Sequence, residues 1–101
     1  MMTTSITRFS LPAGVPRDAI RQGLNDVAPQ FRVIPGLLRK YFLLSPDGTM
    51  GGGVYLWASL AEAKAFSEGP LRAMVRERFH VEPEITYYET PVIVDNTRAT
   101  D

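Results

Sequence analysis

The chain contains no cysteine and only one histidine, His80, among its 101 residues. Without cysteine the protein has no disulfides, thiolate metal sites or thiol nucleophiles. A single histidine needs several carboxylates to complete a metal site, and the sequence shows no such cluster, so we expect no metal. Neither a Ser-His-Asp set nor a pair of carboxylates on neighbouring strands can be assembled, which argues against a hydrolase.

Net charge and long apolar runs are also lacking. Eleven basic and eleven acidic side chains cancel, so no net field attracts nucleic acid or anionic lipid. No run approaches the ~20 apolar residues that span a bilayer, and the N-terminus lacks the apolar core of a secretory signal. We expect a cytoplasmic protein with no nucleic-acid or membrane partner. The length predicts one domain over residues 1–101, with an ordered core at about 6–95.

The most informative segment is 36–57, GLLRKYFLLSPDGTMGGGVYLW. Two β-forming runs flank Ser45-Pro46-Asp47-Gly48, which predicts a tight turn because proline presets φ and glycine permits the turn exit. The three glycines at 51–53 match neither a P-loop nor a dinucleotide fingerprint. We expect them to allow a bulge or the close approach of another backbone.

The N-terminal third predicts a strand and then a helix. The strand covers 6–11, and Pro16 fits the first turn of the helix. Pro29 is expected to end the helix early. An apolar stripe at helical spacing marks its buried face: Ile20, Leu24, Val27 and Phe31.

The C-terminal half predicts two helical segments and a last strand. Ser59 and Glu62 form a capping-box pattern at the helix start, and Gly69-Pro70 is expected to interrupt the helix. The strand covers 84–90, and the tail 96–101 is expected to be disordered. The predicted inward residues of the two helical segments are Leu60, Ala63 and Phe66, then Leu71, Met74, Val75 and Phe79.

The element order β-α-β-β-α-β indicates an α+β, ferredoxin-like protomer, whose helices cover one face of an antiparallel sheet. The second strand is nevertheless apolar on both sides, with Leu37, Tyr41 and Leu43 on one and Leu38, Phe42 and Leu44 on the other. A second copy of the sheet is the simplest cover for the free face, so we predict a homodimer. The run Val92–Val94 could then pair with the partner's edge strand.

Aromatic residues with polar tips gather on the predicted strands and suggest the wall of a small-molecule cavity. The candidate ligand-binding residues are Tyr41, Tyr55, Tyr87 and His80. His80 follows a helix end, where it could carry a proton or simply cap the helix. Arg39 lies in mid-strand between apolar neighbours, and a buried arginine needs a partner. That partner could be Glu89 or an oxygen atom of a substrate.

On these residues the chain resembles the dimeric α/β-barrel superfamily, and most closely its YdhR-like mono-oxygenase group. The matching features are Pro35-Gly36, the Gly-Gly-x-Tyr-Leu-aromatic run from Gly52 to Trp57, and the Ser-x-x-Glu-Ala helix start from Ser59 to Ala63. The similarity covers about residues 6–95, and its motifs are structural more than catalytic. It implies a ferredoxin-like protomer, a dimer closed through the sheets and a cavity between sheet and helices.

Relatives in this superfamily include cofactor-free oxygenases of polycyclic phenols and quinones, in which the protein stabilises a substrate anion that reduces oxygen itself. By this resemblance Arg39 would stabilise the anion, and Trp57 with Tyr55 would exclude water and orient rings. Heme-degrading relatives use an Asn on the first strand and a helical His. Here the first strand has no Asn and His80 follows the helix, so no cofactor is expected. The alternatives are a non-catalytic binding or stress-response protein and an isomerase or cyclase.

Overall fold

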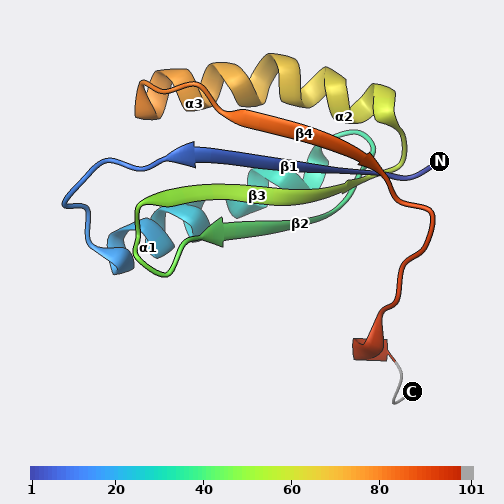
Figure 1. The fold of residues 1–101 in the computed structure, drawn as a ribbon, viewed down its shortest axis with the longest axis horizontal. Coiled ribbons are helices and arrows are strands. Elements are labelled where there is room, and N and C mark those ends of the chain that lie inside the picture. Colours follow the sequence, from blue (N-terminus) through green and yellow to red (C-terminus); the bar gives the residue numbers. More distant parts are fainter. Residues whose placement is uncertain (99–101) are drawn as a thin grey trace.

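The computed structural model describes residues 1–98 and has the predicted order of helices and strands (Figure 1). The strands are β1 (Thr3–Ser10), β2 (Leu37–Leu44), β3 (Met50–Trp57) and β4 (Glu84–Glu89). The α-helices are α1 (Arg17–Val27), α2 (Leu60–Phe66) and α3 (Arg72–Phe79). Two 3₁₀ segments, η1 (Ala28–Val33) and η3 (Asn96–Arg98), and one π-helical turn, η2 (Ser67–Leu71), complete the structure. No helix within residues 1–98 is long and apolar enough to cross a membrane.

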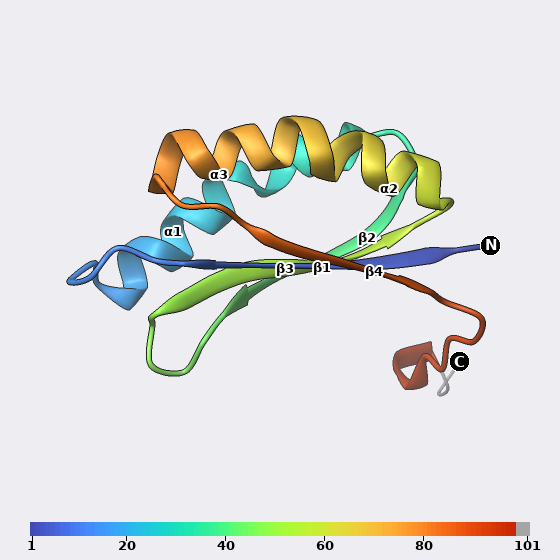
Figure 2. The same cartoon turned by 45° about the horizontal axis from the view of Figure 1, so that its top comes forward.

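The four strands form one antiparallel sheet in the order β2-β3-β1-β4. The helices lie on one face of this sheet, and the C-terminal arm after β4 lies on the other side (Figure 2). We call the helix-covered side the inner face and the opposite side the outer face. This arrangement confirms the predicted α+β, ferredoxin-like fold.

The hairpin between β2 and β3 turns where the sequence predicts. The amide of Gly48 donates to the carbonyl of Ser45 at 3.0 Å, and the amide of Ser45 donates to the carbonyl of Met50 at 2.9 Å. This turn sets the register of the two strands and places Lys40 opposite Tyr55. From Lys40 to Leu44, each side chain of β2 therefore lies on the same face of the sheet as its paired residue on β3.

A bulge between Leu37 and Arg39 changes the predicted faces of β2. Leu37 pairs with Trp57 and packs against the core, so its predicted place beside Tyr41 and Leu43 is wrong. Leu38, predicted on the side of Phe42, is 56% exposed. The extra residue of a bulge shifts the side-chain alternation by one position, which explains both errors.

β1 and α1 differ from prediction at their ends. β1 begins at Thr3, three residues before the predicted start, and α1 begins at Arg17 with Pro16 as its N-cap. The α-helix ends at Val27, as the position of Pro29 predicts, and the chain continues as a 3₁₀ helix.

The N-cap half of the predicted capping box at the start of α2 is confirmed, whereas the Glu62 carboxylate meets the Ser59 hydroxyl rather than the Ser59 amide. The Ser59 hydroxyl accepts a hydrogen bond from the Glu62 amide at 3.2 Å and donates to the Glu62 carboxylate at 2.9 Å. Gly69-Pro70 does not break the helix as expected, because η2 absorbs both residues in one wide turn. Leu60, predicted to face inward, is 45% exposed.

Close approach of two backbones explains one of the three consecutive glycines. A Cβ atom at Gly52 would overlap the carbonyl oxygen of Thr7 on β1. The prediction that these glycines serve the backbone is therefore confirmed for Gly52. The inner side of β1 is polar and buried at Thr3, Ser5 and Thr7, and it continues to Phe9, which packs against the core.

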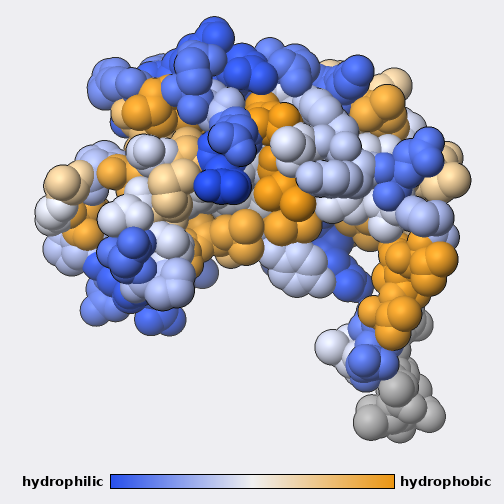
Figure 3. Space-filling view, in the orientation of Figure 1, coloured by the Kyte–Doolittle hydropathy of each residue, from blue (hydrophilic) through white to orange (hydrophobic). Residues whose placement is uncertain are grey.

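The C-terminal arm Pro91–Val94 forms no strand and projects as an apolar segment (Figure 3). Val92 and Val94 are 76% and 79% exposed. The predicted disordered tail is wrong for Asn96–Arg98, which form the 3₁₀ turn η3, and its remainder, residues 99–101, lies outside the described residues.

Candidate functional site

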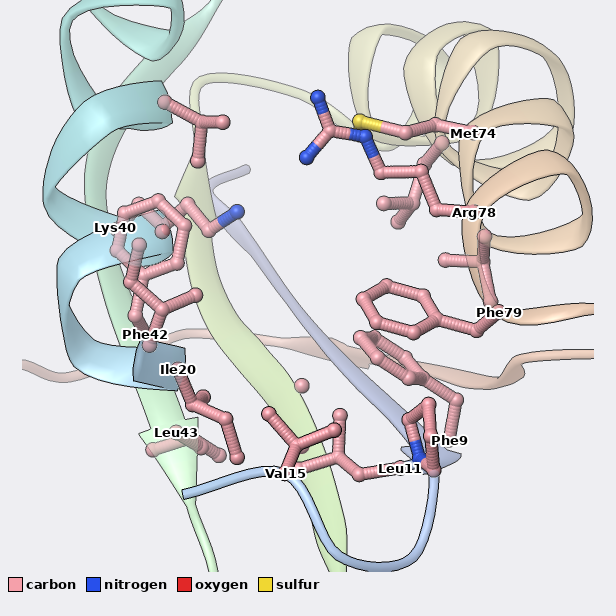
Figure 4. Close-up of a pocket in the computed structure, with 18 of the residues that line it drawn as sticks. Phe9, Leu11, Val15, Ile20, Lys40, Phe42, Leu43, Met74, Arg78 and Phe79 are labelled. Carbon is pink, nitrogen blue, oxygen red and sulfur yellow. The ribbon is translucent and has the colours of Figure 1, made fainter. Parts of the chain in front are cut away.

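A cavity of about 260 Å³ lies between the inner face of the sheet and the helices α1 and α3. Most of its wall is apolar, with α1 contributing Ile20, Leu24 and Val27 and the 3₁₀ helix contributing Phe31. Figure 4 shows the labelled side chains around the open space, with Lys40 and Phe42 from β2 facing Met74, Arg78 and Phe79 from α3. One water molecule occupies roughly 30 Å³ in the liquid, so the cavity offers the space of about nine water molecules. This space suits a ligand of one or two fused rings.

Aromatic rings form two sides of this cavity. Phe9 and Phe79 stack at 4.9 Å between ring centroids, and Phe31 meets Phe42 edge to face at 5.3 Å. Rings in these arrangements offer flat faces against which a planar ligand can pack. The cavity wall therefore includes flat apolar surfaces.

Only three titratable side chains line the cavity within the described part of the chain: Lys40, Tyr55 and Arg78. None of its lining residues is an acid. A ligand that becomes negatively charged would therefore meet two basic groups and no repelling carboxylate in the cavity wall.

The Lys40 ammonium lies among three aromatic rings. Its Nζ is 3.4 Å from the ring centroid of Phe31, 3.9 Å from that of Phe42 and 4.4 Å from that of Tyr55. Gly53 leaves room for this placement, because a Cβ there would come within 3.1 Å of the Lys40 Cε. The hairpin register and this missing side chain together direct Lys40 across the sheet into the cavity.

Burial lowers the pKa of Lys40 to about 7, because removing the ammonium from water disfavours the charged form. The ring faces act in the opposite direction, since an aromatic quadrupole attracts a cation. Both protonation states of this amine are thus accessible near neutral pH. Such an amine can act as a base or as a nucleophile.

Tyr55 was predicted as a ligand-binding residue, and it does line the cavity. It is 1% exposed, and burial raises the pKa of its hydroxyl above the ordinary value of 10, so the phenol stays protonated at neutral pH. Its ring stacks on Trp57 with 5.8 Å between centroids and 12° between planes. Trp57 thereby fixes the orientation of a cavity wall.

Trp57, predicted as catalytic, is fully buried and does not line the cavity. Its indole Nε1 donates a hydrogen bond to the Ser5 hydroxyl at 2.8 Å. It packs against Phe66 of α2 as well as Tyr55. Trp57 is therefore a core residue that packs against Tyr55, which itself lines the cavity.

Arg39 and Tyr41 lie on the outer face of the sheet, away from the cavity. The guanidinium donates to the Tyr41 hydroxyl at 3.2 Å and lies 3.5 Å from the carboxylate of Asp95. The expectation that Arg39 is buried is wrong, since half of its side chain is exposed, and its acidic partner is Asp95 rather than Glu89. The structure therefore separates both residues from the candidate site.

Tyr87 and His80 also lie outside the cavity. The Tyr87 hydroxyl donates to the Glu68 carboxylate at 2.6 Å, and burial, followed by this hydrogen bond, raises its pKa to about 12. His80 ends α3 in the left-handed conformation, with φ of 57°, and its side chain is exposed. Of the two interpretations of His80, its position fits the helix cap.

The sequence interpretation missed Lys40 and Arg78. A signal for Lys40 was present, because the four-residue turn already sets the strand register and places Lys40 opposite Tyr55. Arg78 gave no comparable signal, since an arginine in the last turn of a helix is usually a surface residue.

No protein-family model matches the chain, and no curated protein matches it. Several solved structures match its fold. One is a protein of unknown function from Nitrosomonas europaea, at 16% identity and a TM-score of 0.72, covering 92% of each chain. A second is the ActVA-Orf6 monooxygenase of Streptomyces coelicolor in complex with nanaomycin D, at 17% identity and a TM-score of 0.65, covering 91% of this chain and 89% of that one.

A third is SnoaB, a cofactor-independent oxygenase from Streptomyces nogalater, at 14% identity and a TM-score of 0.64, covering 92% of this chain and 96% of that one. At these identities the matches establish a shared fold and leave the chemistry of the site to its own residues. The chain thus has the fold of structures that include a monooxygenase and a cofactor-independent oxygenase as well as a protein of unknown function, and membership of the YdhR-like group is not established.

Proposed function

We propose that the protein is a cofactor-independent monooxygenase that acts on a small phenolic or quinone-like aromatic molecule bound in the cavity. The observation that carries the proposal is the cavity itself, a space of about 260 Å³ with an apolar wall, two basic side chains and no lining acid. The shared fold with one structure described as a monooxygenase and one described as a cofactor-independent oxygenase supports it.

Lys40 takes the role that the sequence analysis assigned to Arg39, because Arg39 lies on the outer face. The neutral amine accepts the proton of a phenolic hydroxyl, and the resulting ammonium pairs with the phenolate. The electron-rich anion then reduces oxygen. In the overall reaction the phenol and one O₂ molecule give a quinone and water. A ring C–H carbon gains one oxygen atom as a carbonyl, and the other oxygen atom leaves as water with the hydrogens lost from that carbon and from the hydroxyl group.

Oxygen uptake with a panel of phenols and hydroxynaphthalenes tests the proposal. We expect Lys40→Met to lower turnover by a factor of about 100 or more, which is typical for loss of one group that stabilises a developing anion. Arg39→Ala is the matched control and should leave turnover unchanged. Saturable binding without oxygen uptake would favour a binding protein, and a mass-neutral product formed under nitrogen would favour an isomerase or cyclase.

We further propose that the protein acts as a homodimer closed through the outer faces of the two sheets. The outer face carries exposed apolar side chains, and the arm Pro91–Val94 lies on the same side. Leu38, Tyr41 and Tyr88 are each more than half exposed, and large apolar surfaces of this kind mark interaction sites. Sedimentation at micromolar concentration should report twice the chain mass, and Tyr41→Asp should shift the protein toward the monomer. A monomeric wild-type protein would contradict this proposal.

A further inference from the structure

Among the described residues, no acidic side chain pairs with Lys40 in the cavity. The side chains around its Nζ are the rings of Phe31, Phe42 and Tyr55, and the other ionisable groups that line the cavity are Tyr55 and Arg78. No salt bridge to Lys40 is formed within residues 1–98. Nothing in the cavity wall therefore holds the amine in its protonated form by charge.

We infer that Lys40 is a nucleophilic amine that forms an imine with small aromatic aldehydes and ketones entering the cavity. This activity is separate from the proposed oxygenation, since it uses neither oxygen nor a phenolate. It depends on three features that the structure brings together: the position of the amine in the cavity wall, the flat aromatic faces beside it and the absence of a lining acid.

The reaction is balanced without an oxidant or reductant. The nitrogen lone pair of Lys40 attacks the carbonyl carbon, and the carbonyl π electrons move to the oxygen. A proton passes from nitrogen to oxygen to give a carbinolamine, which then loses hydroxide with one further proton as water and leaves a C=N bond. Arg78 lines the same cavity, and its guanidinium favours the negative charge that develops on the oxygen.

Lys40 is expected to form imines more readily than an ordinary lysine because more of its amine is unprotonated. Burial lowers its pKa to about 7, so at pH 8 a large share of the amine is unprotonated. An ordinary lysine, with a pKa of ~10.4, is less than about 1% unprotonated at that pH. A less basic amine is also a weaker nucleophile, and we therefore expect a net preference of about tenfold or more rather than the full ratio of free amine.

The chain supplies its own control, because Lys40 and Lys64 are its only lysines. Lys64 is exposed on α2 and does not line the cavity. Cleavage after Glu62 places the two lysines on different peptides. Mass spectrometry of a single sample therefore compares the cavity amine with a surface amine under identical conditions.

The experiment uses benzaldehyde and 2-naphthaldehyde as probes at pH 8 under nitrogen, with borohydride to reduce any imine to a stable amine. We expect the adduct on Lys40 with about tenfold or greater preference over Lys64. Lys40→Arg, which keeps a basic side chain but forms no imine, should lose this adduct, and Lys64→Arg should retain it. Between pH 6 and pH 8 the yield at Lys40 should rise at least several-fold.

Equal labelling of the two lysines by both aldehydes, or labelling confined to Lys64 and the N-terminal amine, would overturn the inference. Circular dichroism of each variant ensures that a lost adduct reflects lost chemistry rather than unfolding. Because the trapping proceeds without oxygen, its failure is distinguishable from failure of the proposed oxygenase. Oxygen uptake by a protein whose Lys40 is not labelled would support the proposed oxygenase and contradict the inference of imine formation.

Discussion

Replacing Lys40 by methionine should stabilise the fold at low pH and have progressively less effect as the pH rises. Methionine fills similar space and removes the charge. Below pH 7 Lys40 is protonated in both states, so the folded protein carries the full cost of burying an ammonium. Between about 7 and 10.5, the ordinary pKa of lysine, the unfolded chain binds a proton that the folded protein does not. The free energy of unfolding of the wild type therefore rises with pH in this window.

The magnitude follows from the lowered pKa. A shift from 10.5 to about 7 corresponds to a cost of about 5 kcal/mol at ~1.4 kcal/mol per pH unit. Cation–π attraction to the three rings offsets part of this cost, by about 1–2 kcal/mol. We therefore expect Lys40→Met to raise the free energy of unfolding by about 3–4 kcal/mol at pH 6. The difference should shrink by at most ~1.4 kcal/mol per pH unit above pH 7.

Urea denaturation at pH 6, 7, 8 and 9 measures this difference, with the protein concentration held constant because dimerisation would also affect stability. Subtracting the variant from the wild type removes the contributions of all other titrating groups. Lys64→Met serves as the control and should show a small difference that does not vary in this way. A difference between wild type and Lys40→Met that is constant from pH 6 to pH 9 would refute the placement of the ammonium in a dry aromatic site.

Three further predictions test the interpretation of other positions. Trp57→Phe should lower the free energy of unfolding by about 1–3 kcal/mol, because the Ser5 hydroxyl loses its buried partner. It should leave ligand binding intact. Loss of binding without a change in stability would indicate that Trp57 contacts the ligand. Gly52→Ala should abolish or severely impair folding, as judged by circular dichroism, whereas Gly23→Ala, which has open space around it, should stabilise α1 by up to about 1 kcal/mol. Arg39→Ala should leave the urea midpoint almost unchanged, as expected for a half-exposed ion pair, and a clear loss of stability would indicate a structural role for its contact with Asp95.

Local patterns in the sequence predict the fold well because each one has a local physical cause. The turn at Ser45–Gly48 depends on proline and glycine within four residues, and the cap at Ser59 depends on Glu62 three positions later. In β4, Ile85 and Tyr87 alternate with Thr86 and Tyr88, and this pattern separates the two sides of the strand correctly, since Tyr87 pairs opposite the buried Ser5. None of these features requires knowledge of distant contacts.

The site is predicted less well because β2 is apolar on both sides. The alternation of its residues alone does not indicate which side the helices cover. The bulge at Leu37/Arg39 also shifts the side-chain alternation by one position, and nothing in the residue types of β2 predicts that bulge. Arg39 was therefore given a buried role that belongs to its neighbour Lys40. The hairpin register would have resolved the choice, because a residue opposite the buried Tyr55 must share its side of the sheet.

The π-helical turn between α2 and α3 keeps one line of buried residues aimed at the sheet. The buried positions Ala63, Ser67, Leu71 and Val75 are spaced by four, and four residues of an α-helix overshoot a full turn by about 40°. A wider turn in the middle corrects this drift. If the whole segment were wound as an α-helix, the three intervals from Ala63 to Val75 would together drift by about 120°. Leu71 and Val75 would then point away from the strands, and the cavity would lose the part of its wall that these two side chains form.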